Sequence, residues 1–235
     1  MNHSYVGSEL ALFAEAHRWK SYFARYLRRF IGRRVLEVGG GIGANIPYLR
    51  SRAVREWVSV EPDAAQAAVI KSRIADGERA ADCLFVCGTI DAVQVAARFD
   101  TLFYLDVLEH IADDRGELAR AARLLAPGGM LVVLAPAHQF LFSSFDKAIG
   151  HFRRYTIATL AALSPPQCQV VHAAWLDSVG FFASLANRLF LSATMPTPRQ
   201  IAFWDKVLVP ASRLLDVLTF HRFGKTVVVV WRRND

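Results

Sequence analysis

The 235-residue sequence is poor in cysteine and has no long apolar run, and both shortages narrow the classes of protein to consider. Its three cysteines, Cys83, Cys87 and Cys168, form no Cys-x-x-Cys pair and are odd in number. We therefore interpret them as small core residues of a protein from a reducing compartment. The N-terminus lacks the apolar run of a signal peptide, and no stretch reaches the ~18 apolar residues of a membrane-spanning helix. The nearest candidate, 179–193, is interrupted by polar residues, so we expect a cytoplasmic protein.

Acidic residues are also in short supply. The chain has 28 Lys and Arg against 21 Asp and Glu, a net charge of +7. Basic residues crowd the first 34 positions, where Glu9 and Glu15 are the only acids. Such an excess attracts phosphates, acidic metabolites, nucleic acid or an anionic membrane, although a solvated basic helix explains it equally well.

Short apolar segments alternate with Ala- and Arg-rich helical segments along the first two thirds of the chain. Near-continuous apolar strands separated by helices are typical of a parallel sheet covered on both faces, here an α/β doubly wound sheet in one domain over 1–235. The expected strands are 35–38, 57–61, 84–87, 101–106 and 130–135, and two of the expected helices are 64–75 and 115–125.

The last third is organised differently. Two further strands, 170–175 and 226–231, are about fifty residues apart, which is too far for a plain hairpin loop. Helices are expected within this insertion over 178–192 and 201–220, with a break or kink at Pro210.

An amphipathic segment at 8–30 completes the expected helices, because its apolar residues can share one stripe. We expect residues 1–32 to form an N-terminal helical cap. We expect the helical insertion, 176–224, to act as a substrate lid or an interface.

A glycine-rich loop closes the first strand in the sequence VLEVGGGIGAN, 35–45. Gly39, Gly41 and Gly43 allow backbone conformations that other residues resist, and they let the main chain approach a ligand. This spacing also fits a dinucleotide-binding fingerprint that ends on Ala44. Glu61, at the end of the second strand, can accept the ribose hydroxyls of either kind of cofactor.

Three further features favour S-adenosylmethionine. Glu37 precedes the glycines, where a negative charge suits the ammonium of a methionine and repels a pyrophosphate. The fourth strand runs into LDVLEHI, 105–111, and a Pro-Gly-Gly turn leads into the fifth strand within LLAPGGMLVV, 124–133. Together these motifs resemble the class I S-adenosylmethionine-dependent methyltransferases over residues 33–160. The most similar group is the small-molecule set that includes ubiquinone- and menaquinone-biosynthesis methyltransferases.

The resemblance implies a seven-stranded, mostly parallel sheet whose last two strands form an antiparallel pair. It also implies roles for individual residues in binding the methionine end, the ribose and the adenine. Asp91 could reach the adenine amine or could instead cap a helix. The residues expected to bind S-adenosylmethionine are Glu37, Gly39, Gly40, Gly41, Gly43, Glu61, Pro62, Thr89, Ile90, Asp91 and Asp106.

On the acceptor side, methyl transfer needs alignment of the acceptor and removal of its proton where it carries one. His110 is one candidate base. The polar segment 135–156 resembles the GH-[FY]-RRY segment of related bacterial methyltransferases and supplies two more, His138 and His151. In the same segment, Arg153, Arg154 and Tyr155 could meet an acidic substrate, or the arginines could form salt bridges, with Asp146 as the obvious partner.

Asp106-x-x-Glu109-His110 also resembles the metal motif of some O-methyltransferases, including those acting on small RNAs. Those enzymes have Glu in place of Asp106 and add a distant His, so no metal ligand is assigned from the sequence.

We expect methyl transfer to a small or lipid-linked acceptor, at oxygen first, with nitrogen and carbon open. The basic surface and the aromatic insertion permit peripheral membrane contact, and a homodimer is compatible with the sequence. Two alternatives remain: a nucleic-acid methyltransferase, with or without a metal, and a non-catalytic cofactor-binding partner subunit. No RNA-binding appendage is readable in the sequence, which counts against the first alternative.

Overall fold

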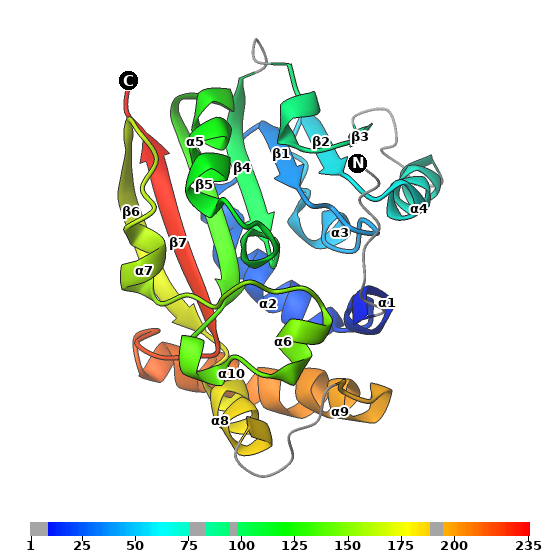
Figure 1. The fold of residues 1–235 in the computed structure, drawn as a ribbon, viewed down its shortest axis with the longest axis vertical. Coiled ribbons are helices and arrows are strands. Elements are labelled where there is room, and N and C mark those ends of the chain that lie inside the picture. The colour runs from blue at the N-terminus through cyan, green and yellow to red at the C-terminus, as the bar shows by residue number, and fades with distance from the viewer. Residues whose placement is uncertain (1–8, 76–82, 95–97, 189–194) are drawn as a thin grey trace.

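The computed structural model describes residues 9–75, 83–94, 98–188 and 195–235. Seven strands form one sheet in the order β3-β2-β1-β4-β5-β7-β6 (Figure 1). The strands are β1 Arg34–Val38, β2 Glu56–Glu61, β3 Cys83–Cys87, β4 Phe99–Leu105, β5 Leu125–Pro136, β6 Cys168–Leu176 and β7 Thr226–Arg233.

The pairing confirms the predicted sheet. Strands β1 to β5 pair in parallel, and β7 runs antiparallel to both β5 and β6. The strand order reverses between β1 and β4, which is the point where open α/β sheets bind their ligands, beyond the carboxyl ends of the strands. The glycine loop leaves β1 at this point, and Asp106 follows β4 there.

The fifth strand differs from the prediction. It begins at Leu125 and contains the Pro-Gly-Gly sequence, which was expected to precede it. Leu125 pairs with Phe99 and Met130 pairs with Thr101, so most of the intervening residues bulge out of the ladder. Gly128 supplies the positive φ of 73° that this bulge requires.

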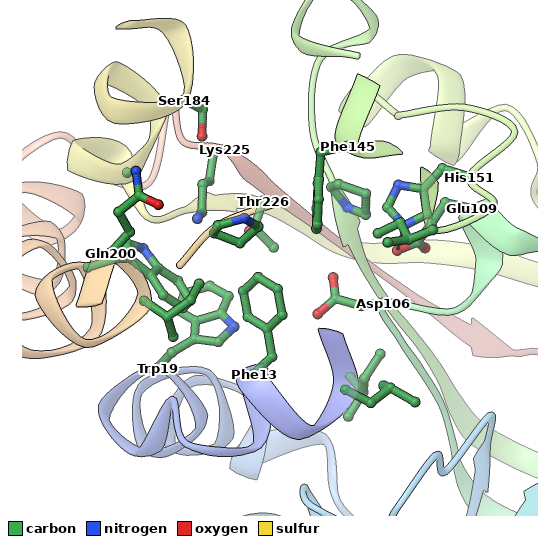
Figure 2. A pocket seen from close by; sticks show the side chains of 18 of the residues that line it. Phe13, Trp19, Asp106, Glu109, Phe145, His151, Ser184, Gln200, Lys225 and Thr226 are labelled. Carbon is green, nitrogen blue, oxygen red and sulfur yellow. Dashed lines mark ion pairs between the residues drawn. The ribbon is translucent and has the colours of Figure 1, made fainter. Parts of the chain in front are cut away.

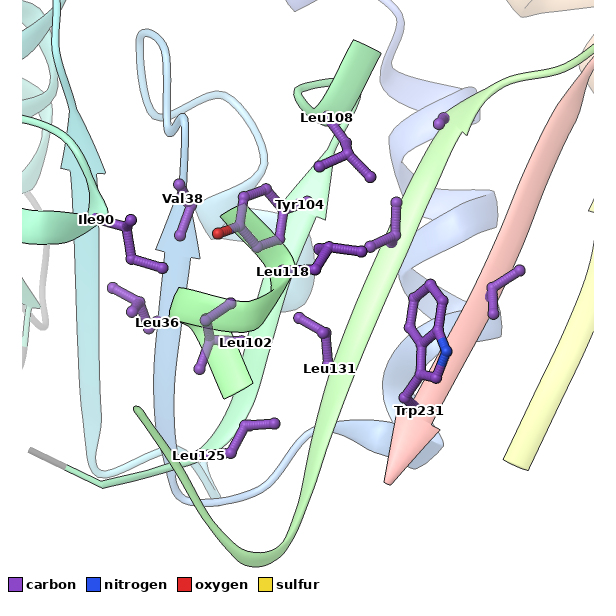
Figure 3. Close-up of a cluster of buried hydrophobic side chains, with 14 of the residues drawn as sticks. Leu36, Val38, Ile90, Leu102, Tyr104, Leu108, Leu118, Leu125, Leu131 and Trp231 are labelled. Carbon is purple, nitrogen blue, oxygen red and sulfur yellow. The ribbon is translucent and has the colours of Figure 1, made fainter. Parts of the chain in front are cut away.

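Helices cover both faces of the sheet. On one face the strands pack against α5 and α7, and Leu36, Leu102, Leu118 and Trp231 are fully buried there (Figure 3). The other face packs against α2, α3 and the helices of the insertion. The helices are α1 Glu9–Ala14, α2 His17–Leu27, α3 Ile46–Leu49, α4 Ala64–Ala75, α5 Asp114–Leu124, α6 Ser144–Ala148, α7 Ile157–Ala161, α8 Ser178–Ala186, α9 Pro198–Phe203 and α10 Val209–Leu218.

Two predicted helices are interrupted. The N-terminal segment divides into α1 and α2 on either side of Glu15 and Ala16, and a short 3-10 turn, Arg28–Phe30, follows α2. The segment predicted over 201–220 consists of α9, a π-helical stretch at Trp204–Leu208, and α10. Pro210 lies in the first turn of α10; because it cannot donate an α-helical hydrogen bond, the wider turn directly precedes it.

The insertion is held to the body of the fold by buried carboxylates. Asp216 on α10 accepts a hydrogen bond from the Tyr22 hydroxyl on α2 at 2.6 Å. Asp205 accepts the backbone amide of Trp19 at 2.8 Å. Within the insertion, Asp177 accepts the indole Nε1–H of Trp204 at 2.7 Å, which ties α8 to the segment before α10. These bonds fix α8, α9 and α10 at the carboxyl ends of the parallel strands, where Figure 1 shows them gathered.

Among the described residues, no helix combines the length and the apolar character that crossing a membrane would need.

Candidate active site

A cavity of about 800 Å³ lies where β1 and β4 end. The glycine loop, the segment that follows β4 and the segment that follows β5 line part of it. The N-terminal helices and the insertion close its remaining sides. Figure 2 shows the acidic groups Asp106 and Glu109 on one side and the Trp19 and Phe13 rings on the other.

The backbone of the glycine loop forms one wall. Gly39 and Gly41 have positive φ angles of 70° and 56°. A Cβ on Gly39 would lie 2.5 Å from a Val107 methyl, so this position tolerates no side chain. A Cβ on Gly41 would make an ordinary van der Waals contact with Leu10 at 3.6 Å, so the positive φ rather than lack of space favours glycine there. The loop is thus a cradle of main chain, which fits the methionine end of S-adenosylmethionine.

Asp106 lies inside the cavity directly after β4. Its φ is +55°, a strained conformation for a residue other than glycine, and its amide donates to the Leu134 carbonyl at 2.8 Å. The carboxylate reaches the space of the cavity but is surrounded by protein. Although the side chain is exposed to the open cavity, the protein around it limits its hydration and raises its pKa to about 6, against the opposing effect of His151 and Lys225.

Glu109, His110 and His151 form a cluster beside Asp106, and each offers one metal-ligating atom within 4.8 Å of the others. Glu109 is fully buried and neither of its carboxylate oxygens has a hydrogen-bond partner. His151 Nε2 lies 3.7 Å from Glu109 Oε1, and the two imidazole rings meet edge to face with centroids 4.5 Å apart. Burial, followed by the charge of His151, lowers the pKa of His110 to about 4, whereas burial raises the pKa of Glu109 well above its usual range.

Asp146 organises this side of the cavity. It is the third residue of α6, where it caps the helix by accepting the Ser143 amide. Its Oδ1 binds His151 Nδ1 at 2.8 Å, and its two oxygens also bind Arg154 at 2.8 and 2.9 Å. Burial alone would raise the pKa of Asp146, but the hydrogen bonds from His151 and Arg154 hold it below its usual range. The predicted Asp146–Arg154 salt bridge is therefore present.

Three residues predicted for the acceptor side do not line the cavity. His138 stacks on Trp175 and its Nε2 lies 3.0 Å from the Gly224 carbonyl oxygen. Arg153 forms an ion pair with Asp114, and the Tyr155 hydroxyl donates to the same carboxylate at 2.9 Å. Of the predicted residues, the structure brings His110, His151 and Arg154 to the cavity.

The residues predicted for the ribose and adenine also lie outside the cavity. Glu61 accepts the amides of Gly41 and Asp63 at 2.9 and 3.0 Å, so it supports the loop from below. Ile90 is buried in the core, and Asp91 lies 3.6 Å from Arg120. The alternative role of Asp91 as a helix N-cap is wrong, because it lies within the 3-10 turn Ile90–Ala92.

The remaining predicted cofactor residues are placed as follows. Glu37 is buried and accepts weak hydrogen bonds from Asn45 at 3.4 Å and Trp57 at 3.3 Å, and burial raises its pKa to about 7. Gly43 has a positive φ of 72°. Gly40 lines the cavity, whereas Glu37, Gly43, Pro62 and Thr89 do not. Their roles toward a bound cofactor stay predictions.

Two lysines that line the cavity were not predicted as site residues from the sequence. Lys20 is 5% exposed, and burial lowers its pKa to about 8. It lies four residues after Ala16 and three before Phe23, on the apolar face of α2, which is the signal that could have revealed it. Lys225 lies over the Trp204 ring at 4.0 Å, directly before β7.

The sheet order, the glycine cradle after β1 and the acidic residue after β4 define the class of protein: a class I methyltransferase fold. Comparison with known families agrees, since residues 11–206 match the model described as a methyltransferase domain. The chain belongs to this methyltransferase domain family, which confirms the prediction.

Among curated proteins, one similar sequence is the ubiquinone biosynthesis O-methyltransferase of Bradyrhizobium sp. (strain ORS 278), 34% identical over 111 residues. That match covers 47% of this chain and 42% of the relative. The protein of the same name from Parvibaculum lavamentivorans is 28% identical over 140 residues, 57% of this chain and 54% of the relative. The chain therefore matches only about half the length of these relatives.

Solved structures show the same fold at low sequence identity. A geranyl diphosphate methyltransferase in complex with S-adenosylmethionine superposes with a TM-score of 0.66 at 15% identity, covering 99% of this chain and 98% of that one. A putative sarcosine dimethylglycine methyltransferase from Galdieria sulphuraria gives 0.64 at 14% identity, covering 93% and 86%.

Proposed function

We propose that this protein transfers a methyl group from S-adenosylmethionine to the oxygen of a small, largely apolar acceptor. One observation carries the proposal: the glycine cradle and the ionisable groups after β4 and β5 line the same cavity. When bound, S-adenosylmethionine supplies a methyl group on a sulfonium, whose carbon–sulfur bond breaks as the acceptor oxygen bonds to the carbon. The curated relatives named O-methyltransferases support oxygen as the acceptor atom.

Different residues of the chain bind the cofactor and the acceptor. The backbone of Gly39 to Gly41 holds the methionine end, and Lys20, whose pKa of about 8 leaves it largely charged at neutral pH, can pair with its carboxylate. Asp106, Glu109, His110 and His151 receive the acceptor hydroxyl and its proton.

The acceptor end of the cavity favours an apolar molecule over a nucleic acid. Its walls include Phe13, Trp19, Phe145, Ile201 and Trp204. Helices of the insertion contribute part of this wall, and we propose that the insertion shapes the acceptor site.

The outer face of the insertion supports a lipid-linked acceptor. We define it as the apolar-basic face, because its exposed apolar side chains stand among exposed arginines and lysines. All three acids of the insertion are buried, so the described part of this segment exposes cations alone among its charged groups. This arrangement complements an anionic membrane surface. The face comprises Lys206, Val207, Arg213, Leu214, Val217, Leu218, Phe220 and Arg222.

Calorimetric titration with S-adenosylhomocysteine and with NAD tests the cofactor. Transfer of tritiated methyl from S-adenosylmethionine to a panel of acceptors then tests the reaction. The panel pairs each phenol carrying a prenyl tail with the same phenol without the tail. We expect S-adenosylhomocysteine to bind, NAD not to bind, and prenylated phenols to be methylated fastest. Binding of NAD alone would overturn the proposal, and preferential methylation of RNA would replace its acceptor class.

A further inference from the structure

The cluster of Glu109, His110 and His151 has an unusual electrostatic environment. Glu109 is fully buried, yet no hydrogen bond reaches either carboxylate oxygen, and the nearest ion-pair partner is His151 Nε2 at 3.7 Å. A buried carboxylate normally has hydrogen bonds or a bound cation to offset its loss of hydration. Both oxygens of Glu109 lack hydrogen bonds of that kind, and one of them lies within the cluster formed with the two imidazoles.

Both imidazoles are already oriented through neighbouring groups. His151 Nδ1 lies 2.8 Å from the Asp146 carboxylate, which leaves Nε2 directed at Glu109. His110 is hydrogen-bonded to the backbone of Gly150, and Nδ1 is the ring nitrogen on that side. Histidine ligands of metal sites characteristically bond to a carboxylate or carbonyl through the nitrogen that does not meet the metal.

The backbone brings the ligands together before any ion binds. The Phe152 amide donates to the Glu109 carbonyl at 2.8 Å, which joins the segment after β4 to the segment after β5. The His151 amide donates to the Asp146 carbonyl at 2.9 Å. The three side chains therefore come from two short, hydrogen-bonded segments and need only small side-chain rotations to converge.

We propose that Glu109, His110 and His151 bind a first-row transition-metal dication at the wall of the cavity. Two imidazoles and one carboxylate form a ligand set that suits Zn²⁺, Fe²⁺, Co²⁺ or Mn²⁺ better than Mg²⁺ or Ca²⁺, which prefer oxygen alone. The ligand atoms lie within 4.8 Å of one another, and a tetrahedral zinc site would draw them to roughly 3.4 Å. Asp106 does not belong to the cluster, so the ligands differ from those that the order of residues along 106–110 suggests.

Such an ion would leave open coordination positions toward the cavity. An acceptor hydroxyl bound there would lose its proton more readily, because a dication lowers the pKa of a bound hydroxyl group. This consequence rests on the proposed function, whereas binding of the ion does not.

The test uses the untagged, full-length protein, stripped with EDTA and dialysed against Zn²⁺, Co²⁺, Mn²⁺ or Mg²⁺ in separate arms. We expect one equivalent of Zn²⁺ by elemental analysis and a Co²⁺ absorption spectrum typical of mixed nitrogen and oxygen ligands. Glu109→Gln and His151→Gln should each weaken Zn²⁺ binding by at least about 30-fold, because even loss of a group that only orients a metal ligand costs roughly 10- to 100-fold. His172→Gln, a histidine that contacts Tyr26 and Arg29 instead, should leave Zn²⁺ binding unchanged.

S-adenosylhomocysteine binding, measured on each variant, verifies that the fold is intact. Failure of the wild-type protein to bind any of the four ions at 100-fold excess over protein overturns the proposal. So does equal loss of binding in His172→Gln, or binding of Mg²⁺ in preference to Zn²⁺. One equivalent of Zn²⁺ in a protein that transfers no methyl group would leave this site standing and reject the proposed function.

Discussion

The half of the cavity expected to bind the cofactor and the half expected to bind the acceptor are formed by different kinds of groups. The cofactor half is main chain: Gly39, Gly40 and Gly41 present a backbone cradle that the Glu61 carboxylate supports from below. The acceptor half is side chain: Asp146 orders His151 and Arg154 through three short hydrogen bonds. A backbone cradle binds what every member of a fold class shares, whereas a side-chain network can change with the acceptor. Each half should therefore fail separately when it is damaged.

Replacing His151 by Gln should have the largest effect: it should impair methyl transfer in the acceptor half and leave cofactor binding intact. The variant loses the imidazole that connects Asp146 to Glu109, so we expect methyl transfer to fall by at least about 100-fold. Binding of S-adenosylhomocysteine, measured by calorimetry, should stay within about twofold of wild type, a difference under 0.5 kcal/mol. His138→Gln should keep most of the activity, because His138 does not line the cavity. The reverse ranking of these two variants would contradict the assignment.

Gly39→Ala should damage the opposite half. At φ +70° alanine is strained, and its Cβ would lie 2.5 Å from Val107, so we expect a penalty of about 1–3 kcal/mol on the bound loop. Affinity for S-adenosylhomocysteine should drop about 10- to 100-fold by calorimetry. Gly128→Ala is the matched control: its φ is +73° and its nearest neighbour is an Arg232 nitrogen at 3.4 Å, but it lies in the β5 bulge. Equal losses of affinity in both variants would mean that general strain, not the cradle, is responsible.

His110→Gln should change the pH dependence of stability in the acceptor half. The folded pKa of His110 is about 4 against an ordinary 6.5, so only the unfolded chain takes up this proton between those values. His110 therefore contributes a loss of stability as pH falls from 7 toward 4, about 2 kcal/mol at pH 5, while Glu37 and Asp106, whose folded pKa values are raised, contribute with the opposite sign in both wild type and variant. Urea unfolding in EDTA at pH 7 and pH 5 should show that His110→Gln lacks this loss. If the free energy of unfolding changes with pH equally in the variant and in wild type, a group other than His110 is responsible for the change.

The smallest expected effect concerns the apolar-basic face outside the cavity. Leu214 and Leu218 are 67% and 65% exposed, and replacing both with Asp puts negative charge where an anionic surface would lie. We expect sedimentation with anionic vesicles to weaken about fivefold or more, roughly 1 kcal/mol, with little change in stability. Leu84→Asp, at a site 54% exposed on β3, is the control. Equal vesicle binding by all three proteins would reject the membrane role of this face.

The contrast between main-chain and side-chain groups also explains how much of the fold and of the site could be predicted from the sequence. All seven strands were predicted, because apolar runs between helices record burial on both faces of a parallel sheet. The cradle was predicted because Gly39 and Gly41 are needed for their positive φ angles. Residues of the acceptor half were harder to assign, since His138 and His151 stand in the same polar segment and differ only in what the fold places beside them.

Asp146 shows most clearly which contacts could not be predicted from the sequence. From the sequence it was a salt-bridge partner for an arginine, and that prediction is confirmed for Arg154. Its bond to His151 lies within one segment, five residues on, but the approach of His151 to the buried Glu109 depends on a meeting of two segments about forty residues apart. No local pattern records such a meeting. Lys20 was missed for a related reason, because its place among basic residues concealed its position on the apolar face of α2.

The ties between α2 and the insertion also constrain how the chain folds. Trp19 and Tyr22 bond to Asp205 and Asp216 across sequence separations of 186 and 194 residues. Loop closure over such separations slows the steps that depend on them, so α2 should dock late in folding. Until the C-terminal residues leave the ribosome, its apolar face has no partner in the insertion. The aromatic side chains of α2 that meet the insertion therefore lack that cover through most of synthesis, although the sheet and α3, which also pack against α2, are made earlier; apolar surface exposed in this way favours aggregation.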